Sequence, residues 1–409
     1  MRRPGRAVGA AALLLTLCAL TPGSAAAPRA AEPVRAGAAP ARVAYPGRAW
    51  ARADPEDMGF DADALAGKVE QAGLTGSSCF AVVRRGRLVG EWYWHGTDPA
   101  APQPVFSITK SVASTLVGLA EADGLLDIDD RASEYIPVWR DTPSEDVTIR
   151  DLLSNTSGRH WDYLTDYPAL TEAANADLLA AGLDQDDEPG TTWVYNNAAI
   201  QALDVVLQEA LGGDVAAFAD ERLFTPVGMR NTRLTHDDDG NTRLNVGLES
   251  TCGDLARFGY LFLRGGAWRG EQVVPRRWVE EATGRPSQRL NDAYGLLWWL
   301  NRPGTVLGDG GTAPTDDPPT DGDKADAATG AATDGADAGD QMAPGAPEDM
   351  FWAVGMGDQV LQVDPGSETV VVRLAPDDPD VGGGIYPVSL AADVLDALVS
   401  PSGRAASPR

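Results

Sequence analysis

The sequence predicts an α/β protein, with an antiparallel sheet flanked by helices and a mainly helical lobe beside it. Strand-like apolar runs concentrate in residues 53–103 and 293–400, whereas helical periodicity dominates residues 104–291. One sheet assembled from two distant segments makes both lobes part of a single domain, residues 51–400. We expect the functional site in the cleft between the lobes. This domain of about 350 residues is long enough to bury a large core.

Residues 1–27 have the composition of a secretory signal peptide. Three arginines among the first six residues precede an apolar run at 8–20, and small residues at 24–27 suit a cleavage site. The run is too short to span a membrane, and the large residue before Cys18 argues against a lipoprotein anchor. We therefore expect a secreted protein without a membrane span. Residues 28–50, rich in Ala, Pro and Arg, are predicted to form a disordered leader.

The first strands of the domain are predicted at residues 79–94, where apolar runs flank a turn at Arg85–Gly86 and favour a β-hairpin. Outside the predicted signal peptide the chain has two cysteines, Cys79 and Cys252. An even pair in an oxidising compartment favours a disulfide. The sequence leaves open whether the two cysteines meet.

Ser107 and Lys110 stand at the start of a helical pattern. Val112, Leu116 and Leu119 recur at helical spacing, which predicts a helix that begins near Ser107. Side chains three apart share a face of a helix, so the Lys110 amine lies beside the Ser107 hydroxyl. Burial disfavours the charged form of a lysine, and a serine nucleophile needs such a base. This Ser-x-x-Lys pattern predicts a nucleophilic serine.

A second set of candidate residues, Tyr195 and Asn197, follows a turn at 188–190 and precedes a helix-like run at 198–211. In an extended segment, side chains two apart point the same way, so both can face one site. We predict that Tyr195 relays a proton between Ser107, Lys110 and the leaving group. Asn197 is expected to hold the lysine and the substrate carbonyl.

The sequence gives little support for a different type of serine hydrolase site or for a metal site. The chain has no Gly-x-Ser-x-Gly motif, and its three histidines do not occur in a metal-binding pattern, so we expect no metal and no cofactor. His160 lies in an aromatic loop with Trp161 and Tyr163, next to the expected pocket. These three residues are candidates for substrate contact. The alternatives are an ordinary loop histidine and simple aromatic packing.

Six segments, in this order and spacing, resemble the class C β-lactamase-related serine hydrolases, a penicillin-binding-protein-like family. They are 106–118, 147–158, 195–197, 221–229, 250–263 and 294–299. Within the family, the chain is most similar to the esterase and 6-aminohexanoate-dimer hydrolase branch. The resemblance covers residues 53–399 and implies a β-lactamase/transpeptidase-like fold with an acyl-enzyme on Ser107.

The resemblance also implies an oxyanion hole formed by the backbone amides of Ser107 and Met356. Gly355 would let the substrate approach the backbone closely, although the glycines near it can also mark a simple strand bend. Where the family carries Lys-Thr-Gly or His-x-Gly, this chain has Ala353, Val354 and Gly355. No cation stands there, which argues against substrates that present a carboxylate.

Residues 308–349 differ from the rest of the domain, with eleven acidic residues against a single lysine and almost no large apolar side chain. They are predicted to be a disordered acidic insertion, and residues 401–409 a tail. The net charge of −27 argues against nucleic-acid binding, which needs a basic surface.

We therefore predict a secreted serine hydrolase that cleaves an ester or a small amide, an esterase or amidase acting through an acyl-enzyme. One alternative is a β-lactamase or a D-alanyl-D-alanine carboxypeptidase. Another is a non-catalytic binding protein on the same scaffold, although such a protein has no chemical need for Ser107, Lys110 and Tyr195 together. The expected partner is a small-molecule substrate, and the oligomeric state stays open.

Overall fold

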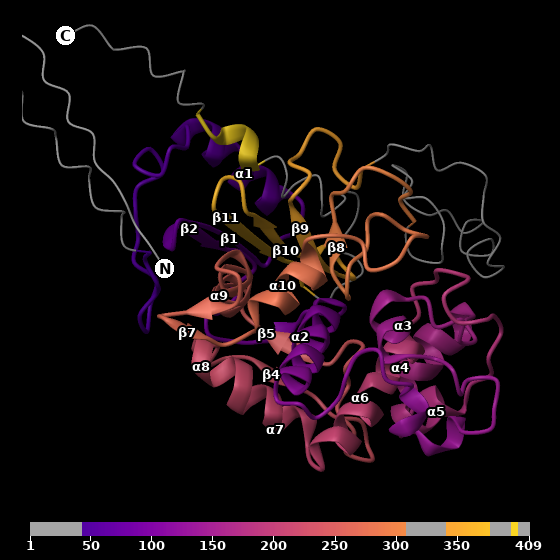
Figure 1. Cartoon of the computed structure of the whole chain (residues 1–409). Helices are drawn as coiled ribbons and strands as arrows, with labels where there is room; N and C mark the ends of the chain where they lie inside the picture. Colours follow the sequence, from indigo (N-terminus) through magenta and orange to yellow (C-terminus); the bar gives the residue numbers. More distant parts are fainter. Residues whose placement is uncertain (1–42, 308–340, 377–393, 400–409) are drawn as a thin grey trace, which may run out of the picture. The chain divides into compact units, whose positions relative to one another are not determined.

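The computed structural model describes residues 43–307, 341–376 and 394–399. The predicted signal peptide, most of the leader and of the acidic insertion, and the C-terminal tail lie outside the described residues. A six-stranded sheet has the strand order β2-β1-β11-β10-β9-β8, and all of its pairings are antiparallel (Figure 1). The strands are β1 (Cys79–Arg84), β2 (Arg87–Tyr93), β8 (Trp299–Leu300), β9 (Phe351–Gly355), β10 (Gln359–Asp364) and β11 (Thr369–Leu374). Strands from both ends of the domain thus form one sheet, which confirms the predicted architecture.

Most helices lie between the two groups of strands in the sequence. They are α2 (Ile108–Ala122), α3 (Ile149–Ser154), α4 (Leu170–Glu172), α5 (Ala176–Gly182), α6 (Asn197–Leu211), α7 (Val215–Ala219), α8 (Thr225–Val227), α9 (Cys252–Leu263) and α10 (Arg276–Thr283). The helices predicted from Ser107 and at 198–211 are confirmed as α2 and α6. Short strands β3 (Gln103–Pro104), β4 (Arg233–Leu234) and β5 (Leu248–Ser250) form a small separate sheet, and β6 (Ala267–Trp268) pairs with β7 (Glu271–Gln272).

The six-stranded sheet is buried on both faces. On β1, Cys79, Ala81 and Val83 belong to the apolar core that contains α2 and α9, whereas Phe80 and Val82 belong to the core that contains α1 (Ala62–Leu74). Successive side chains of a strand point to opposite faces, so a continuous apolar run serves both cores. This explains why the sequence at 79–83 shows no polar alternation.

The predicted hairpin at 79–94 is confirmed. β1 and β2 pair in antiparallel register, and the two residues that join them, Arg85 and Gly86, have φ of 50° and 76°. Two consecutive residues with positive φ give the turn whose twist matches that of the flanking strands.

The predicted boundary of the leader at residue 50 is wrong, because residues 43–50 pack against α9. The ring of Tyr45 makes edge contacts with Tyr260 and Trp268, at centroid distances of 5.8 and 5.4 Å. The Arg257 guanidinium donates to the carbonyl of Gly47 at 2.9 Å. The composition of residues 28–50 gave no indication that Tyr45 packs against these aromatic rings.

The predicted end of the acidic insertion at residue 349 is also too late. The Asn301 side chain accepts a hydrogen bond from the Ala343 amide at 2.8 Å and donates to the carbonyls of Ala343, Ala346 and Pro347, each at 3.1 Å. One buried amide therefore orders residues that composition alone predicted to be disordered.

None of the helices in the described part of the chain has the length and apolar character that a membrane crossing requires.

A disulfide joins Cys79, the first residue of β1, to Cys252, the first residue of α9. Both cysteines are buried, and 173 positions separate them in the sequence. The bridge ties the sheet to a helix that packs on it, and it closes a long loop in the unfolded chain, which is the main source of a disulfide's stabilisation in the chain-entropy account.

The Cys79→Ala/Cys252→Ala double variant should have a free energy of unfolding lower by about 2–5 kcal/mol, because its unfolded chain is less constrained. Urea unfolding of both proteins measures the difference. As a control, a reductant should lower the urea midpoint of the wild type and leave that of the double variant unchanged. Equal midpoints for the two oxidised proteins would show that the bridge adds no stability.

Candidate active site

Ser107 is the residue immediately before the first turn of α2. Phe106, just before it, has φ of 47°, a conformation that costs a non-glycine residue on the order of 1 kcal/mol or more. This sharp entry leads the chain into α2, whose first residues include Lys110. The Lys110 amine donates to the Ser107 hydroxyl at 2.6 Å, and the lysine is only 1% exposed. The predicted Ser-x-x-Lys arrangement is thus present in the structure.

Lys110 has a second acceptor in the backbone carbonyl of Asn245, at 2.7 Å. Its amine also lies 5.1 Å from the centroid of the Tyr195 ring. Tyr195 is buried and stacks on Trp299 of β8, with ring centroids 5.8 Å apart. The fold therefore gathers the serine, the lysine and the tyrosine around one buried amine.

The end of β9 lies directly against the nucleophile. A Cβ atom added to Gly355 would lie 3.2 Å from the Ser107 amide nitrogen and 2.3 Å from the Val105 carbonyl oxygen, so only glycine fits there. Met356 follows in the turn to β10 and is 61% exposed. Among the hydrogen bonds of the described residues, none has the Ser107 or the Met356 amide as donor. The backbone just before Met356 therefore lies against the Ser107 amide.

Asn197 is the first residue of α6, and its side-chain amide nitrogen donates to the Asp166 carboxylate at 2.8 Å. The same carboxylate accepts from the backbone amides of Asn197 and Ala198, at 3.0 and 2.8 Å, and from the Trp161 indole at 3.1 Å. Burial raises the pKa of Asp166 to about 6, against the opposing effect of these donors and of the Lys110 charge. Asp166 therefore fixes the helix end that follows Tyr195.

Sequence reasoning missed Asp166. It lies in a π-helical turn, Thr165–Ala169, and no local motif marks it. Its partners on α6 are about 30 positions away in the sequence, so only the folded chain brings them together. Its place in a loop rich in aromatic residues was the only available signal, and Asp162 in the same loop shares it.

The structure places His160 between two carboxylates. One ring nitrogen lies 2.7 Å from Asp186 and the other 3.0 Å from Asp162. Burial lowers the pKa of His160, but its hydrogen bonds to Asp186 and Asp162 outweigh this and raise the pKa above its usual value. Because both ring nitrogens are occupied, the alternative of a loop histidine describes His160 better than substrate contact does.

The other two candidates for substrate contact, Trp161 and Tyr163, have separate roles. Trp161 donates to Asp166, as described above, so it supports the loop from inside. Tyr163 stacks on Tyr167 with ring centroids 5.1 Å apart and is 42% exposed. Of the two, Tyr163 presents more surface to solvent.

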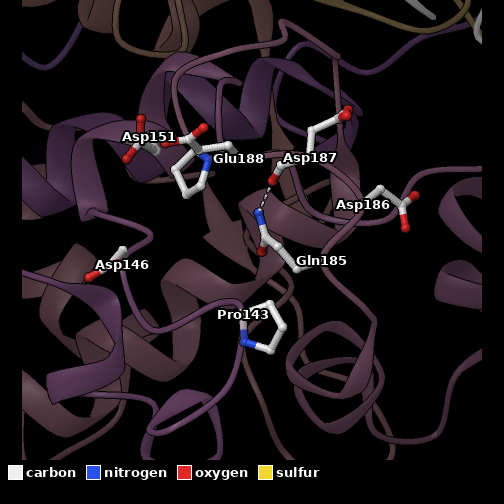
Figure 2. A pocket seen from close by; sticks show the side chains of 8 residues that line it. Pro143, Asp146, Asp151, Gln185, Asp186, Asp187 and Glu188 are labelled. Carbon is white, nitrogen blue, oxygen red and sulfur yellow. Dashed lines mark hydrogen bonds between the residues drawn. The ribbon is translucent and has the colours of Figure 1, made fainter.

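A separate acidic cavity of about 520 Å³ lies beside α3 and the loop before residue 190, and it contains none of the predicted site residues (Figure 2). Its lining residues are Pro143, Asp146, Asp151, Gln185, Asp186, Asp187, Glu188 and Pro189. Gln185 is tied to the carbonyl of Asp187 at 2.7 Å, and Asp151 belongs to the capping box at the start of α3. Within the described ranges, no cluster of His, Cys, Asp and Glu side chains is suited to a metal ion.

Comparison with known proteins decides the family. The sequence pattern of the Beta-lactamase family matches residues 62–393, which is most of the chain. The chain belongs to the Beta-lactamase family. The match confirms the resemblance inferred from the order of the motifs, and it agrees with the antiparallel sheet and helices described above.

Individual members of the family are distant relatives. The 6-aminohexanoate-dimer hydrolase of Paenarthrobacter ureafaciens is 24% identical over 267 residues, covering 58% of this chain and 68% of that protein. A penicillin-binding protein of Bacillus subtilis is 32% identical over 136 residues, covering 31% of this chain and 29% of that protein. The crystal structure of a family VIII carboxylesterase matches with a TM-score of 0.59 and 15% identity, over 85% of this chain and 98% of that one. The last likeness concerns the fold alone.

Because the pKa of Asp166 is raised in the folded protein, the free energy of unfolding of the wild type should depend on pH. Asp166→Asn should lack this part of the pH dependence. The folded protein holds the Asp166 proton more tightly than the unfolded chain does, with a pKa of about 6 against the ordinary 3.8. The associated stabilisation is complete below pH 4 and is lost as the pH rises through 6. This amounts to on the order of 3 kcal/mol relative to Asp166→Asn, which cannot titrate.

Urea unfolding of the wild type and of Asp166→Asn across pH 4 to 7 measures this effect. Comparison with the variant cancels the titration of other carboxyl groups. A difference in unfolding free energy that stays constant over this range would contradict the assignment.

Proposed function

We propose that this protein is a secreted serine hydrolase that cleaves neutral esters or small amides through an acyl-enzyme on Ser107. The observation that carries the proposal is the 2.6 Å hydrogen bond between the Lys110 amine and the Ser107 hydroxyl. A serine is a weak nucleophile unless an adjacent base takes its proton, and this buried amine lies within proton-transfer distance of the hydroxyl oxygen.

In the first half of the reaction, neutral Lys110 takes the Ser107 proton while the serine oxygen attacks the substrate carbonyl carbon. The negative charge that develops on the carbonyl oxygen is held by the Ser107 and Met356 amides. Tyr195, next to Lys110, relays that proton to the leaving alcohol or amine as its bond to the carbonyl carbon breaks. The product of this half is an ester of Ser107.

In the second half, water replaces the leaving group. Lys110 and Tyr195 take a proton from the water as its oxygen attacks the acyl carbon. The intermediate collapses, the proton returns to Ser107, and the acid is released. The same residues thus serve both halves with no external cofactor.

Ala353 on β9 supports the proposed substrate class. It is buried in the core shared with α2, and by the family resemblance it takes the place of the cation of Lys-Thr-Gly or His-x-Gly. Nothing at that position can form a charge-assisted hydrogen bond to a substrate carboxylate. The Paenarthrobacter relative is named a 6-aminohexanoate-dimer hydrolase, and since two such units are joined by an amide bond, the name supports the small-amide part of the proposal. A β-lactamase or a D-alanyl peptidase is the second candidate, since the Beta-lactamase family includes this chain.

Secretion is proposed from the signal-peptide pattern at 1–27. The Cys79–Cys252 disulfide supports it, because structural disulfides persist mainly in oxidising compartments.

Ser107→Ala should lower the hydrolysis of a short-chain nitrophenyl ester by roughly a thousandfold or more, since it removes the nucleophile. It should also abolish covalent labelling by a fluorophosphonate. Ser111→Ala is the matched control, because Ser111 lies one turn further along α2 and its hydroxyl is bonded to the Leu297 carbonyl at 2.8 Å. Wild-type ester hydrolysis by Ser107→Ala would overturn the mechanism.

The enzyme should turn over a neutral ester roughly ten- to hundredfold more efficiently than an anionic β-lactam. A missing charge-assisted hydrogen bond costs on the order of 1.5–3 kcal/mol. Values of kcat/KM for a nitrophenyl ester and for a chromogenic cephalosporin test this. Efficient cephalosporin hydrolysis would favour the second candidate and leave the role of Ser107 intact.

A further inference from the structure

Gln201 is a fully buried residue on α6 whose side chain is saturated with hydrogen bonds. Its amide oxygen accepts from the backbone amides of Leu244 and Asn245, at 2.9 and 3.3 Å. Its amide nitrogen donates to the Thr242 carbonyl at 2.8 Å and to the Asp177 carboxylate at 2.7 Å. Two donors and two acceptor positions are the full capacity of a glutamine side chain.

Three of these four bonds go to one segment, residues 242–245, which has no regular secondary structure and lies between β4 and β5. The Asp204 carboxylate also accepts from the Thr242 amide, at 2.9 Å. Beyond the segment, the Leu248 amide donates to the Thr109 hydroxyl of α2 at 2.9 Å. The segment is therefore held by α6, by α2 and by its pairing with the chain at Thr235 and His236, and Gln201 is its principal attachment to α6.

The same segment supplies the Asn245 carbonyl that binds the Lys110 amine at 2.7 Å. A neutral amine has one lone pair, which must point at the Ser107 hydroxyl for proton transfer. Binding of one N–H to a fixed carbonyl restricts rotation of the amine about its last bond. A displacement of the carbonyl would let the lone pair turn away from Ser107.

We propose that Gln201 is a positioning residue for Lys110. It holds residues 242–245 so that the Asn245 carbonyl orients the lysine amine toward Ser107. This inference rests on the proposed function, because it assigns Gln201 a role in activating the same nucleophile. The hydrogen bonds of Gln201 described above reach residues 242–245 and Asp177, so it acts on Lys110 through the backbone of the segment.

The test compares Gln201→Met with the matched control Gln208→Met. Gln208 lies on the same helix and donates to Asp177 and Asp204 at 3.0 and 2.5 Å, but none of its hydrogen bonds reaches residues 242–245. Both variants lose a hydrogen bond to the buried Asp177 carboxylate, so both are expected to lose stability. Only Gln201→Met removes hydrogen bonds made directly to residues 242–245, because Gln208 is linked to them only through Asp204.

The readout is the second-order rate of Ser107 labelling by a fluorophosphonate, which reports nucleophile activation without a natural substrate. Gln201→Met should label roughly ten- to hundredfold more slowly than the wild type, since small misplacements of a catalytic group have effects of this size. Gln208→Met should stay within about twofold of the wild type. With a nitrophenyl ester, Gln201→Met should lower kcat and leave KM nearly unchanged. Rates are measured on the folded fraction, determined by circular dichroism.

Gln201→Glu is the second comparison, because in its protonated form it keeps an acceptor oxygen for Leu244 and Asn245 and one donor for Thr242 or Asp177. It should label faster than Gln201→Met. If Gln201→Met does not fold, Gln201→Asn and Gln208→Asn replace the pair, since the shorter amide stays polar but cannot span the same distances.

Equal labelling rates for the Gln201 and Gln208 variants would overturn this inference alone. A wild-type protein that is not labelled at Ser107 would instead overturn the proposed function.

Discussion

A lysine amine buried in the interior needs hydrogen-bond partners, and the site is arranged around this need. Lys110 obtains one partner from its own helix, the Ser107 hydroxyl, and another from the Asn245 carbonyl. The Tyr195 ring lies close to the amine, and the Asp166 carboxylate interacts with its charge. Because burial disfavours a charged amine, the environment that makes Lys110 a base also requires that every neighbour be held in place.

Two parts of helix α6, its first turn and Gln201, hold these neighbours of Lys110. At its start, Asp166 binds the first amides of the helix and the Asn197 side chain, directly after Tyr195. One turn later, Gln201 binds the segment that carries the Asn245 carbonyl. The tyrosine and the carbonyl therefore share one rigid support, and a movement of α6 would shift both relative to α2. The six-stranded sheet contributes to the same site through the end of β9, where Gly355 lies against the Ser107 amide.

Several features of the fold could be predicted because they depend on neighbours in the sequence. The start of α2, the β1–β2 hairpin and the helix after Tyr195 all follow from spacing and turn chemistry. The predictions that were wrong concern segments whose order comes from distant contacts. Residues 43–50 are held by α9, and Asn301 holds residues 341–349. Composition carries no information about such contacts.

The sequence by itself determined the family, because the order of the motifs is specific, and it predicted Ser107 as the nucleophile and Lys110 as its base, because the two are one helical turn apart. Only the tertiary structure decided what surrounds them. Asp166 meets Asn197 across 31 positions of sequence, Gln201 meets Asn245 across 44, and Asn245 meets Lys110 across 135. The ring nitrogens of His160 are bound by Asp186 and Asp162 rather than open to substrate. The physical reason is that a buried polar group takes whichever partner the packed chain brings within about 3 Å, and the sequence does not record that partner.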